Sequence, residues 1–215
     1  MIPKIIHQIW IGDQNKRPQK YIDSWKTKNP NWEHILWTEK NIPELINEAQ
    51  YKAINEFPGK ADILRYELLY FYGGIFIDAD SECIKPLDDL KFNDFDLVCC
   101  YENEILNGDL CSNGYLASRK KSIIMRDIIA RINTYTTSFL NQLPDLSSWK
   151  YLGPMLLTNV INNFKYESEK INILPSHIFI PRHHTGLEHY DDSEVYAKQY
   201  WGSTINYLGK TQVTY

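Results

Sequence analysis

The sequence predicts an α/β fold in which strands, mostly parallel, are joined by crossover helices. Short apolar runs alternate along the chain with longer segments whose apolar residues recur at helical spacing. Near the middle, a helical pattern leads through a Gly-Gly pair into an apolar run that ends in two aspartates. With 215 residues, of which 43% are hydrophobic, the chain is large enough for a sizeable core. We expect one domain over residues 1–215.

The first half predicts two strand–helix pairs before the central segment. An apolar run at 5–11 ends at a Gly-Asp pair, and Pro18 begins a helical pattern. The predicted strands are 5–11 and 34–38, and the predicted helices are 18–28 and 43–53. We expect a turn at 57–59, where Pro and Gly stand side by side.

The second half predicts more strands, two amphipathic helices and a polar tail. The strands are 81–84, 96–101, 112–118, 171–174 and 178–180. The helices are 122–135, with Ser122 as the expected N-cap, and 155–164. From Arg182 onward the chain is polar and aromatic without a clear period, so 182–215 is expected to form a loop or lid over the active site.

The central segment, residues 60–89, reads KADILRYELLYFYGGIFIDADSECIKPLDD. It predicts a helix over 60–72, a left-handed glycine in the Gly-Gly pair, and a buried strand over 75–77. Side chains alternate along an extended chain, so Asp78 and Asp80 face the same side while Ala79 turns inward. Two carboxylates at the end of an apolar strand are costly without a cation. Their oxygens suit Mg²⁺ or Mn²⁺.

Two further features accompany the aspartate pair. Asp62 and Arg65 are three residues apart and therefore share a helix face, where they act together in a site or form an ordinary surface ion pair. Trp10 stands at the end of the first predicted strand, where ligands bind in open α/β sheets. It is placed either to stack on a nucleotide base or to pack in the core.

Composition narrows the function classes and the compartment. The formal net charge of −4 argues against a nucleic-acid-binding protein. The four cysteines form no CxxC pair, which predicts buried thiols in a reducing compartment. The N-terminal apolar patch is too short to span a membrane and lacks a signal-peptide cleavage site. We expect a soluble cytoplasmic protein without a transmembrane segment, with peripheral attachment to a membrane left open.

The chain resembles glycosyltransferase family 32, the DXD sugar-binding family. The resemblance rests on IPKIIHQIWIG at the start, the central segment, SNGYLAS, GPMLLT and a Trp-containing tail. Its most specific part is D-x-x-R followed by Gly-Gly, a strand and D-x-D. The family includes capsular-polysaccharide and Golgi mannosyl transferases, with the glucosyltransferase domains of clostridial toxins as distant relatives. It implies a GT-A fold, Rossmann-like, with a mixed and mostly parallel central sheet.

The resemblance also implies roles for individual residues. Asp80 would bind the metal, Mn²⁺ or Mg²⁺, directly, and Asp78 would contact the donor and reach the metal through water. Asp62 and Arg65 would hold donor sugar hydroxyls, with Arg65 also near the diphosphate. The catalytic residues would thus be Asp78, Asp80 and Arg65. The other expected donor-binding residues are Trp10, which would stack on the base, its neighbour Ile11, and Asn113.

The family also implies the reaction. A UDP- or GDP-sugar would donate its sugar to a hydroxyl of a glycan or other acceptor, as in polysaccharide biosynthesis, with retention of configuration. One departure concerns the tail, which reads AKQYWGST over 197–204 where the family often has A-x-H-x-W…S-W. Gln199 stands in place of His and Thr204 in place of Trp. The expected third metal ligand is therefore Gln199, or else Ser203 or a nearby histidine.

Several alternatives follow from the same residues. A haloacid-dehalogenase-type phosphatase also carries DxD after a strand, but Glu82 occupies the position where that family has Thr or Val. A calcium loop is disfavoured because Cys83 stands at the sharp-turn position. The histidines at 183, 184 and 189 invite a zinc hypothesis but match no zinc spacing. A non-catalytic sugar-nucleotide or glycan-binding module stays open, and the altered tail is its best support.

Overall fold

The computed structural model describes residues 1–215 except 145–146, 164–168, 191–193, 203 and 205–215. The strands are β1 (Ile5–Ile9), β2 (Glu33–Trp37), β3 (Gly74–Ile77), β4 (Ser81–Cys83), β5 (Leu97–Tyr101), β6 (Cys111–Ser118), β7 (Ile171–Leu174) and β8 (Ala197–Gln199). The helices are α1 (Gln19–Lys28), α2 (Glu48–Ala53), α3 (Phe57–Tyr72), α4 (Glu104–Asn107), α5 (Ile123–Asn133), α6 (Thr137–Asn141), α7 (Ser148–Tyr151) and α8 (Pro154–Asn163).

The central sheet has six strands in the order β2-β1-β3-β6-β5-β7. The pairs β1–β2, β1–β3 and β5–β7 are parallel, whereas β6 runs antiparallel to both β3 and β5. The prediction of a mixed, mostly parallel sheet is therefore confirmed. Strand β1 has β2 as its neighbour on one side and β3 on the other. The strand order therefore reverses between β1 and β3, and α/β sheets bind ligands at such a switch point.

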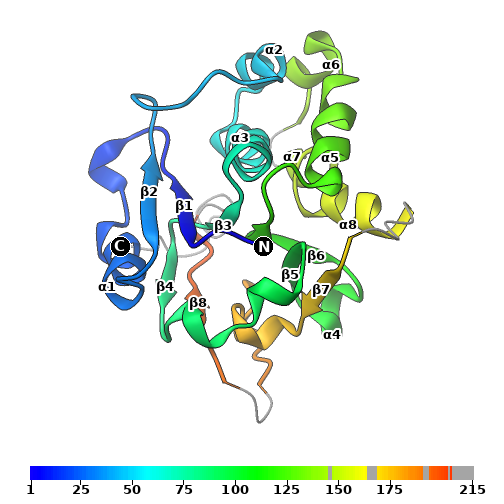
Figure 1. Ribbon diagram of the computed structural model, residues 1–215. Helices are drawn as coiled ribbons and strands as arrows, with labels where there is room; N and C mark the ends of the chain where they lie inside the picture. Colours follow the sequence, from blue (N-terminus) through cyan, green and yellow to red (C-terminus); the bar gives the residue numbers. More distant parts are fainter. Residues whose placement is uncertain (145–146, 164–168, 191–193, 203, 205–215) are drawn as a thin grey trace.

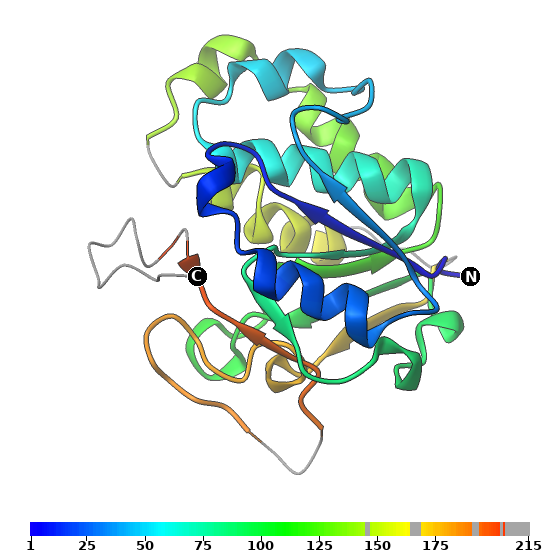
Figure 2. The ribbon, with the colours of Figure 1, turned by 90° about the vertical axis from the view of Figure 1, so that its left-hand side faces the viewer.

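Two hydrophobic cores cover the two faces of this sheet (Figures 1 and 2). On one face lie α3, α5 and α8; on the other lie α1 and a two-stranded ribbon of β4 and β8. Strand β3 shows how one sequence serves both faces, since Phe76 packs into the first core while Ile75 and Ile77 pack into the second. This is the period of two that a strand imposes on its side chains.

The predicted cysteine state is confirmed, since all four cysteines are free and buried. Among the described residues, none of the helices combines the length and the apolar composition needed to cross a bilayer.

Several predicted element boundaries are wrong, each for a local reason. Residues 57–59 form the first turn of α3 instead of a loop, because Pro58 fits a helix start where its missing N–H is not needed. Residues 43–47 lie before α2, and the Glu67 carboxylate accepts the N–H groups of Ile46 and Asn47 at 2.6 and 2.8 Å. The Glu67 carboxylate thus takes the place of the carbonyl acceptors that a helix over 43–53 would have offered to these two N–H groups.

Two other local predictions are also wrong. The run at 178–180 is buried but not a strand, because its N–H groups bond back to Pro175 and Ser176 in a 3₁₀ turn. Ser122 stands at the N-cap of α5 without a side-chain cap bond. Instead, Glu169 accepts from the Ser122 hydroxyl at 3.0 Å and from the Ile123 N–H at 2.6 Å.

Candidate active site

The Gly-Gly pair sets the entry of β3 and hence the position of the aspartates. Both Gly73 and Gly74 have positive φ, 67° and 100°. A Cβ at Gly74 would lie 2.5 Å from the Ile5 carbonyl oxygen of β1, so only glycine lets the two strands pair here. The sequence predicts one left-handed glycine in this pair, whereas both glycines have positive φ. Four residues after Gly74, Asp78 emerges at the carboxyl end of β3.

Arg65 is the cation at the centre of the site. Its side chain is 7% exposed, lies over the Phe76 ring, and ion-pairs with Asp62 at 3.2 Å and with Asp78 at 3.4 Å. Its Nη1 donates to the Asn113 carbonyl oxygen at 2.7 Å. The alternative of a surface ion pair is excluded, since a buried guanidinium shared by two carboxylates is held in a defined position.

Asp62 is buried beside Arg65 and faces β6. Its Oδ1 accepts a hydrogen bond from Asn113 Nδ2 at 2.9 Å, and the same amide donates to the Tyr66 hydroxyl at 3.1 Å. Burial raises the pKa of Asp62 to about 6, while the Arg65 charge and the Asn113 hydrogen bond oppose that rise. The structure thus joins Asp62, Arg65, Asp78 and Asn113, four of the predicted donor-binding residues, in one network.

Gly114 belongs to this network although its role is not apparent from the sequence. Its carbonyl accepts the Asp78 N–H at 3.0 Å, and a Cβ at this position would overlap Asp78 Oδ2. The glycine inside β6 therefore leaves room for the carboxylate. A glycine within the SNGYLAS strand is the only signal of this in the sequence.

Asp80 is held by the tail of the chain. Its Oδ1 accepts from Gln199 Nε2 at 3.0 Å, and its Oδ2 accepts the Gly202 N–H at 2.6 Å. Ala79 between the aspartates is buried, as predicted. Burial, and then the neighbouring Asp78 charge, raise the pKa of Asp80 to about 6. Among the described residues Arg65 pairs with Asp78 but no basic side chain forms an ion pair with Asp80, so the Asp80 carboxylate has no cationic partner and fits a divalent cation.

Gln199 faces both aspartates from β8. Its Nε2 lies 3.0 Å from Asp80 Oδ1 and 3.4 Å from Asp78 Oδ2. Its Oε1 accepts from the Tyr115 hydroxyl at 2.9 Å, and that hydroxyl also contacts Ser81 Oγ at 2.5 Å. Gln199 is thus next to the predicted metal position but presents its nitrogen there. Ser203, the other predicted tail ligand, lies outside the described residues.

Trp10 and Ile11 follow β1, the strand next to β3. Trp10 is half-buried, and its indole N–H donates to the Asp13 carbonyl at 3.0 Å, so it is not a core residue. Ile11 packs in the core shared with α3. Gly12, with φ 106°, faces the Phe57 ring, and its N–H donates to Glu39 at 2.5 Å. Trp10 thus follows the carboxyl end of β1, at the same sheet edge as Asp78, and its stacking role stays a prediction.

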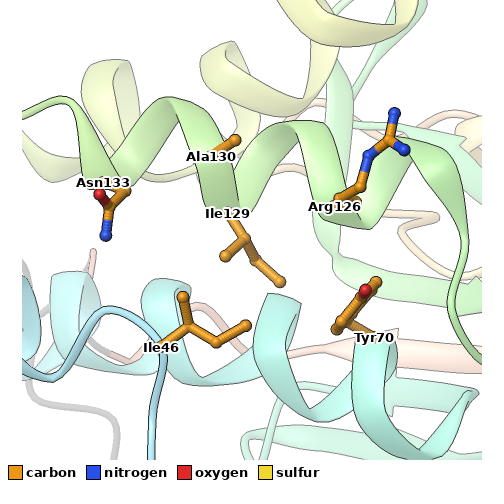
Figure 3. Close-up of a pocket in the computed structure, with 6 residues that line it drawn as sticks. All are labelled: Ile46, Tyr70, Arg126, Ile129, Ala130 and Asn133. Carbon is orange, nitrogen blue, oxygen red and sulfur yellow. The ribbon is translucent and has the colours of Figure 1, made fainter.

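A separate groove of about 370 Å³ lies in the helical layer (Figure 3). It is lined by Ile46, Tyr70, Arg126, Ile129, Ala130 and Asn133. Tyr70 comes from α3, and the last four of these residues lie along α5. The groove shares no residue with the aspartate site.

The sequence matches a known family over the same central part of the chain. Residues 15–96 match the family described as "Glycosyltransferase sugar-binding region containing DXD motif". The matched span contains Asp62, Arg65, Asp78 and Asp80. Over this span the chain is similar to the DXD glycosyltransferase family. The recognition made from the sequence motifs is therefore confirmed.

The chain is also similar to proteins with assigned names, one of them a mannosyltransferase. The chain is 38% identical over 98 residues to "Inositol phosphoceramide mannosyltransferase 3" of Schizosaccharomyces pombe, covering 41% of this chain and 27% of that protein. It is 30% identical over 157 residues to "Subversion of eukaryotic traffic protein A" of Legionella pneumophila, covering 58% of this chain and 24% of that protein. The chain therefore matches about a quarter of the length of these relatives.

Solved structures confirm the GT-A fold. The structure described as "PaToxG Glycosyltransferase" aligns with a TM-score of 0.61 at 20% identity, covering 75% of this chain and 69% of that one. The catalytic domain of alpha-toxin from Clostridium novyi aligns with a TM-score of 0.60 at 10% identity, covering 74% and 72%. At these identities the similarity establishes the fold, and the site rests on the residues described above.

Proposed function

We propose that this protein is a metal-dependent glycosyltransferase that moves a sugar from a nucleoside-diphosphate donor to a hydroxyl acceptor. The observation that carries the proposal is the network of Asp62, Arg65, Asp78 and Asn113 beside Asp80. It combines a fixed guanidinium, an amide and three carboxylates at the carboxyl edge of the sheet. Such a set suits both sugar hydroxyls and a cation–diphosphate pair.

The donor is proposed to lie along the switch point between β1 and β3. Trp10, with Ile11 behind it, would stack on the base, which adds roughly 1–3 kcal/mol of binding free energy. Asp62 and Asn113 would accept and donate hydrogen bonds to sugar hydroxyls. Arg65 would hold the sugar and the diphosphate in one orientation. Asp78, which contacts the same guanidinium nitrogen as Asp62, would also contact the donor.

The cation site is proposed at Asp80, with Asp78 contributing through water and Gln199 as the third group. Rotation of the Gln199 amide would turn Oε1 toward the cation and Nε2 toward the Tyr115 hydroxyl, which can accept that bond while donating to Ser81. The same three side chains thus remain hydrogen-bonded in both orientations. Mn²⁺ and Mg²⁺ suit this all-oxygen set. When bound, the cation would neutralise charge on the departing diphosphate.

The tail over 182–215 is proposed to be the lid of this site. Support comes from β8, which pairs antiparallel with β4 directly after the aspartates. The Gly202 N–H then closes on Asp80, and Tyr200 N–H donates to the Asp80 carbonyl at 3.1 Å. This arrangement ties the lid to the site that it would shield from water.

In the proposed reaction the donor C1–O bond to the diphosphate breaks and a C1–O bond to the acceptor hydroxyl forms. The acceptor proton leaves with the nucleoside diphosphate or to solvent. Retention of configuration is the prediction that the family resemblance carries. The names of the relatives favour a mannosyl donor and a glycan- or lipid-linked hydroxyl acceptor, so GDP-mannose is tested first. The four free buried cysteines support a reducing compartment such as the cytoplasm.

A non-catalytic binding module is the second candidate. The observation that favours it is Gln199, whose amide already fills the position between the aspartates and stands where the family often has His. Such a module would bind the donor without cleaving it.

A donor screen tests the proposal and separates the two candidates. UDP- and GDP-sugars are incubated with the protein and Mn²⁺, and both nucleoside-diphosphate release and thermal shift are measured. Release with at least one donor supports a transferase. A thermal shift without any release identifies a binding module, and neither signal with any donor contradicts both.

A further inference from the structure

We propose that Glu102, His183 and His184 form a second metal site, for a transition metal such as Zn²⁺. These three residues can each offer a ligand atom, and the three atoms lie within 4.8 Å of one another. Glu102 directly follows β5, while the histidines belong to the segment after the 3₁₀ turn at Ser176–Ile178. This site does not depend on the proposed function and uses none of the residues assigned to the donor or to the DXD cation.

The spacing of the ligand atoms fits tetrahedral coordination. His183 Nε2 lies 3.2 Å from Glu102 Oε1. Two ligands at roughly 2.0–2.2 Å from a tetrahedral Zn²⁺ lie about 3.4 Å apart. The rings of His183 and His184 have centroids 4.0 Å apart, although neighbours in an extended chain would point to opposite sides. The backbone therefore turns both imidazoles toward one carboxylate.

Outer hydrogen bonds hold two of the ligands in position. Asn107 Nδ2 donates to Glu102 Oε1 at 2.8 Å, which fixes the carboxylate. His183 Nδ1 accepts the Thr185 backbone N–H at 3.3 Å and lies 2.9 Å from Thr185 Oγ1, so the ring is held with Nε2 toward Glu102, where a metal would replace the Nε2 proton. Polar partners of this kind orient the ligands in protein metal sites. His183 is 3% exposed, so its ring is confined before any ion arrives.

The donor chemistry separates this site from the aspartate pair. Two imidazole nitrogens and one carboxylate favour Zn²⁺, Co²⁺ or Ni²⁺ over Mg²⁺ and Mn²⁺, whereas the aspartate site offers oxygens. A fourth position remains for water or for another group. We therefore expect the protein to bind two classes of divalent cation, each at its own site.

The location gives the second site a structural consequence. Both β3 and β5 are antiparallel to β6, so Glu102 and Asp78 stand at the same edge of the sheet. The Trp201 ring contacts both imidazoles, with centroids 5.3 Å apart in each case. The next residue, Gly202, donates its N–H to Asp80. A metal on the histidines would hold Trp201, and with it the part of the tail that closes on Asp80.

Cobalt titration of the chain, without a histidine tag, tests this inference. Co²⁺ is added in the presence of excess Mg²⁺, and the visible absorption of tetrahedral Co²⁺ with nitrogen ligands is followed, then displaced with Zn²⁺. Wild type should bind one Co²⁺ in this form. His184→Ala and Glu102→Gln should weaken the affinity at least tenfold.

Two matched variants keep the assignment falsifiable. His189→Ala removes a nearby histidine that contacts Ser176 and Glu104, and Asp80→Asn changes the other cation site. Both should leave the Co²⁺ spectrum and affinity unchanged. Circular dichroism must confirm that each variant is folded. If His184→Ala does not fold, Glu102→Gln alone is used to test the loss of a ligand. No such absorption in wild type, equal affinity in folded Glu102→Gln, or loss in Asp80→Asn would overturn the proposal.

Discussion

Replacing Gln199 with histidine is expected to strengthen Mn²⁺ binding. In the structure Gln199 Nε2 donates to Asp80 Oδ1 at 3.0 Å, and a cation must break that bond to reach the carboxylate. A hydrogen bond to a charged group contributes about 1.5–3 kcal/mol. A neutral imidazole at position 199 would present a lone pair instead, with its Nδ1–H directed to the Tyr115 hydroxyl. The gain should therefore be roughly 10- to 150-fold in the Mn²⁺ dissociation constant.

The assay is isothermal titration of Mn²⁺ at pH 8, where the introduced imidazole is neutral. Gln199→Leu is the matched control, because it removes the hydrogen bond and the ligand oxygen together. We expect the control to bind Mn²⁺ more weakly than Gln199→His. An unchanged or weaker affinity in folded Gln199→His would refute the assignment of Gln199 as the residue facing the cation.

Three further predictions concern the donor site and the core. Gly114→Ala should raise the donor KM at least tenfold, since the new Cβ overlaps Asp78 Oδ2; an unchanged KM would show that Asp78 does not contact the donor. Trp10→Ala should raise the donor KM about tenfold through lost stacking, and a normal KM would remove Trp10 from the donor site. His7 is buried, accepts from the Trp37 indole N–H at 3.1 Å, and has its pKa lowered to about 4, mainly by burial. The unfolded chain therefore binds the extra proton first, and the free energy of unfolding should fall by about 3 kcal/mol as the pH falls from 6.5 toward 4. Chemical denaturation at several pH values tests this, because the fall should be absent in His7→Gln; an identical fall in both proteins would contradict it.

The central part of the site is predictable because its determinants are local. The helix carrying Asp62 and Arg65, the Gly-Gly turn and the Asp78–Asp80 alternation all lie within one short segment, and period and turn chemistry place them. The sequence pattern does not specify how deeply the Arg65 side chain is buried, and the structure supplies that depth. That depth depends on Asn113, 48 residues further along the chain.

The parts that resist prediction depend on distant contacts. Gln199 reaches Asp80 across 119 residues of sequence, and its amide is oriented by Tyr115 on a different strand. Glu102 joins His183 across 81 residues, so no linear spacing displays that cluster. The buried run at 178–180 shows a related limit, since an apolar run of three residues indicates burial without specifying a strand.

Turnover by Asp80→Asn tests the central claim most directly. Nucleoside-diphosphate release is measured for wild type and variant with the donor found in the screen and saturating Mn²⁺, and circular dichroism and melting temperature establish that the variant is folded. Our account predicts that release is abolished, because the amide of Asn lacks the negative charge with which Asp80 would bind the cation. Full Mn²⁺-dependent release by folded Asp80→Asn would contradict it.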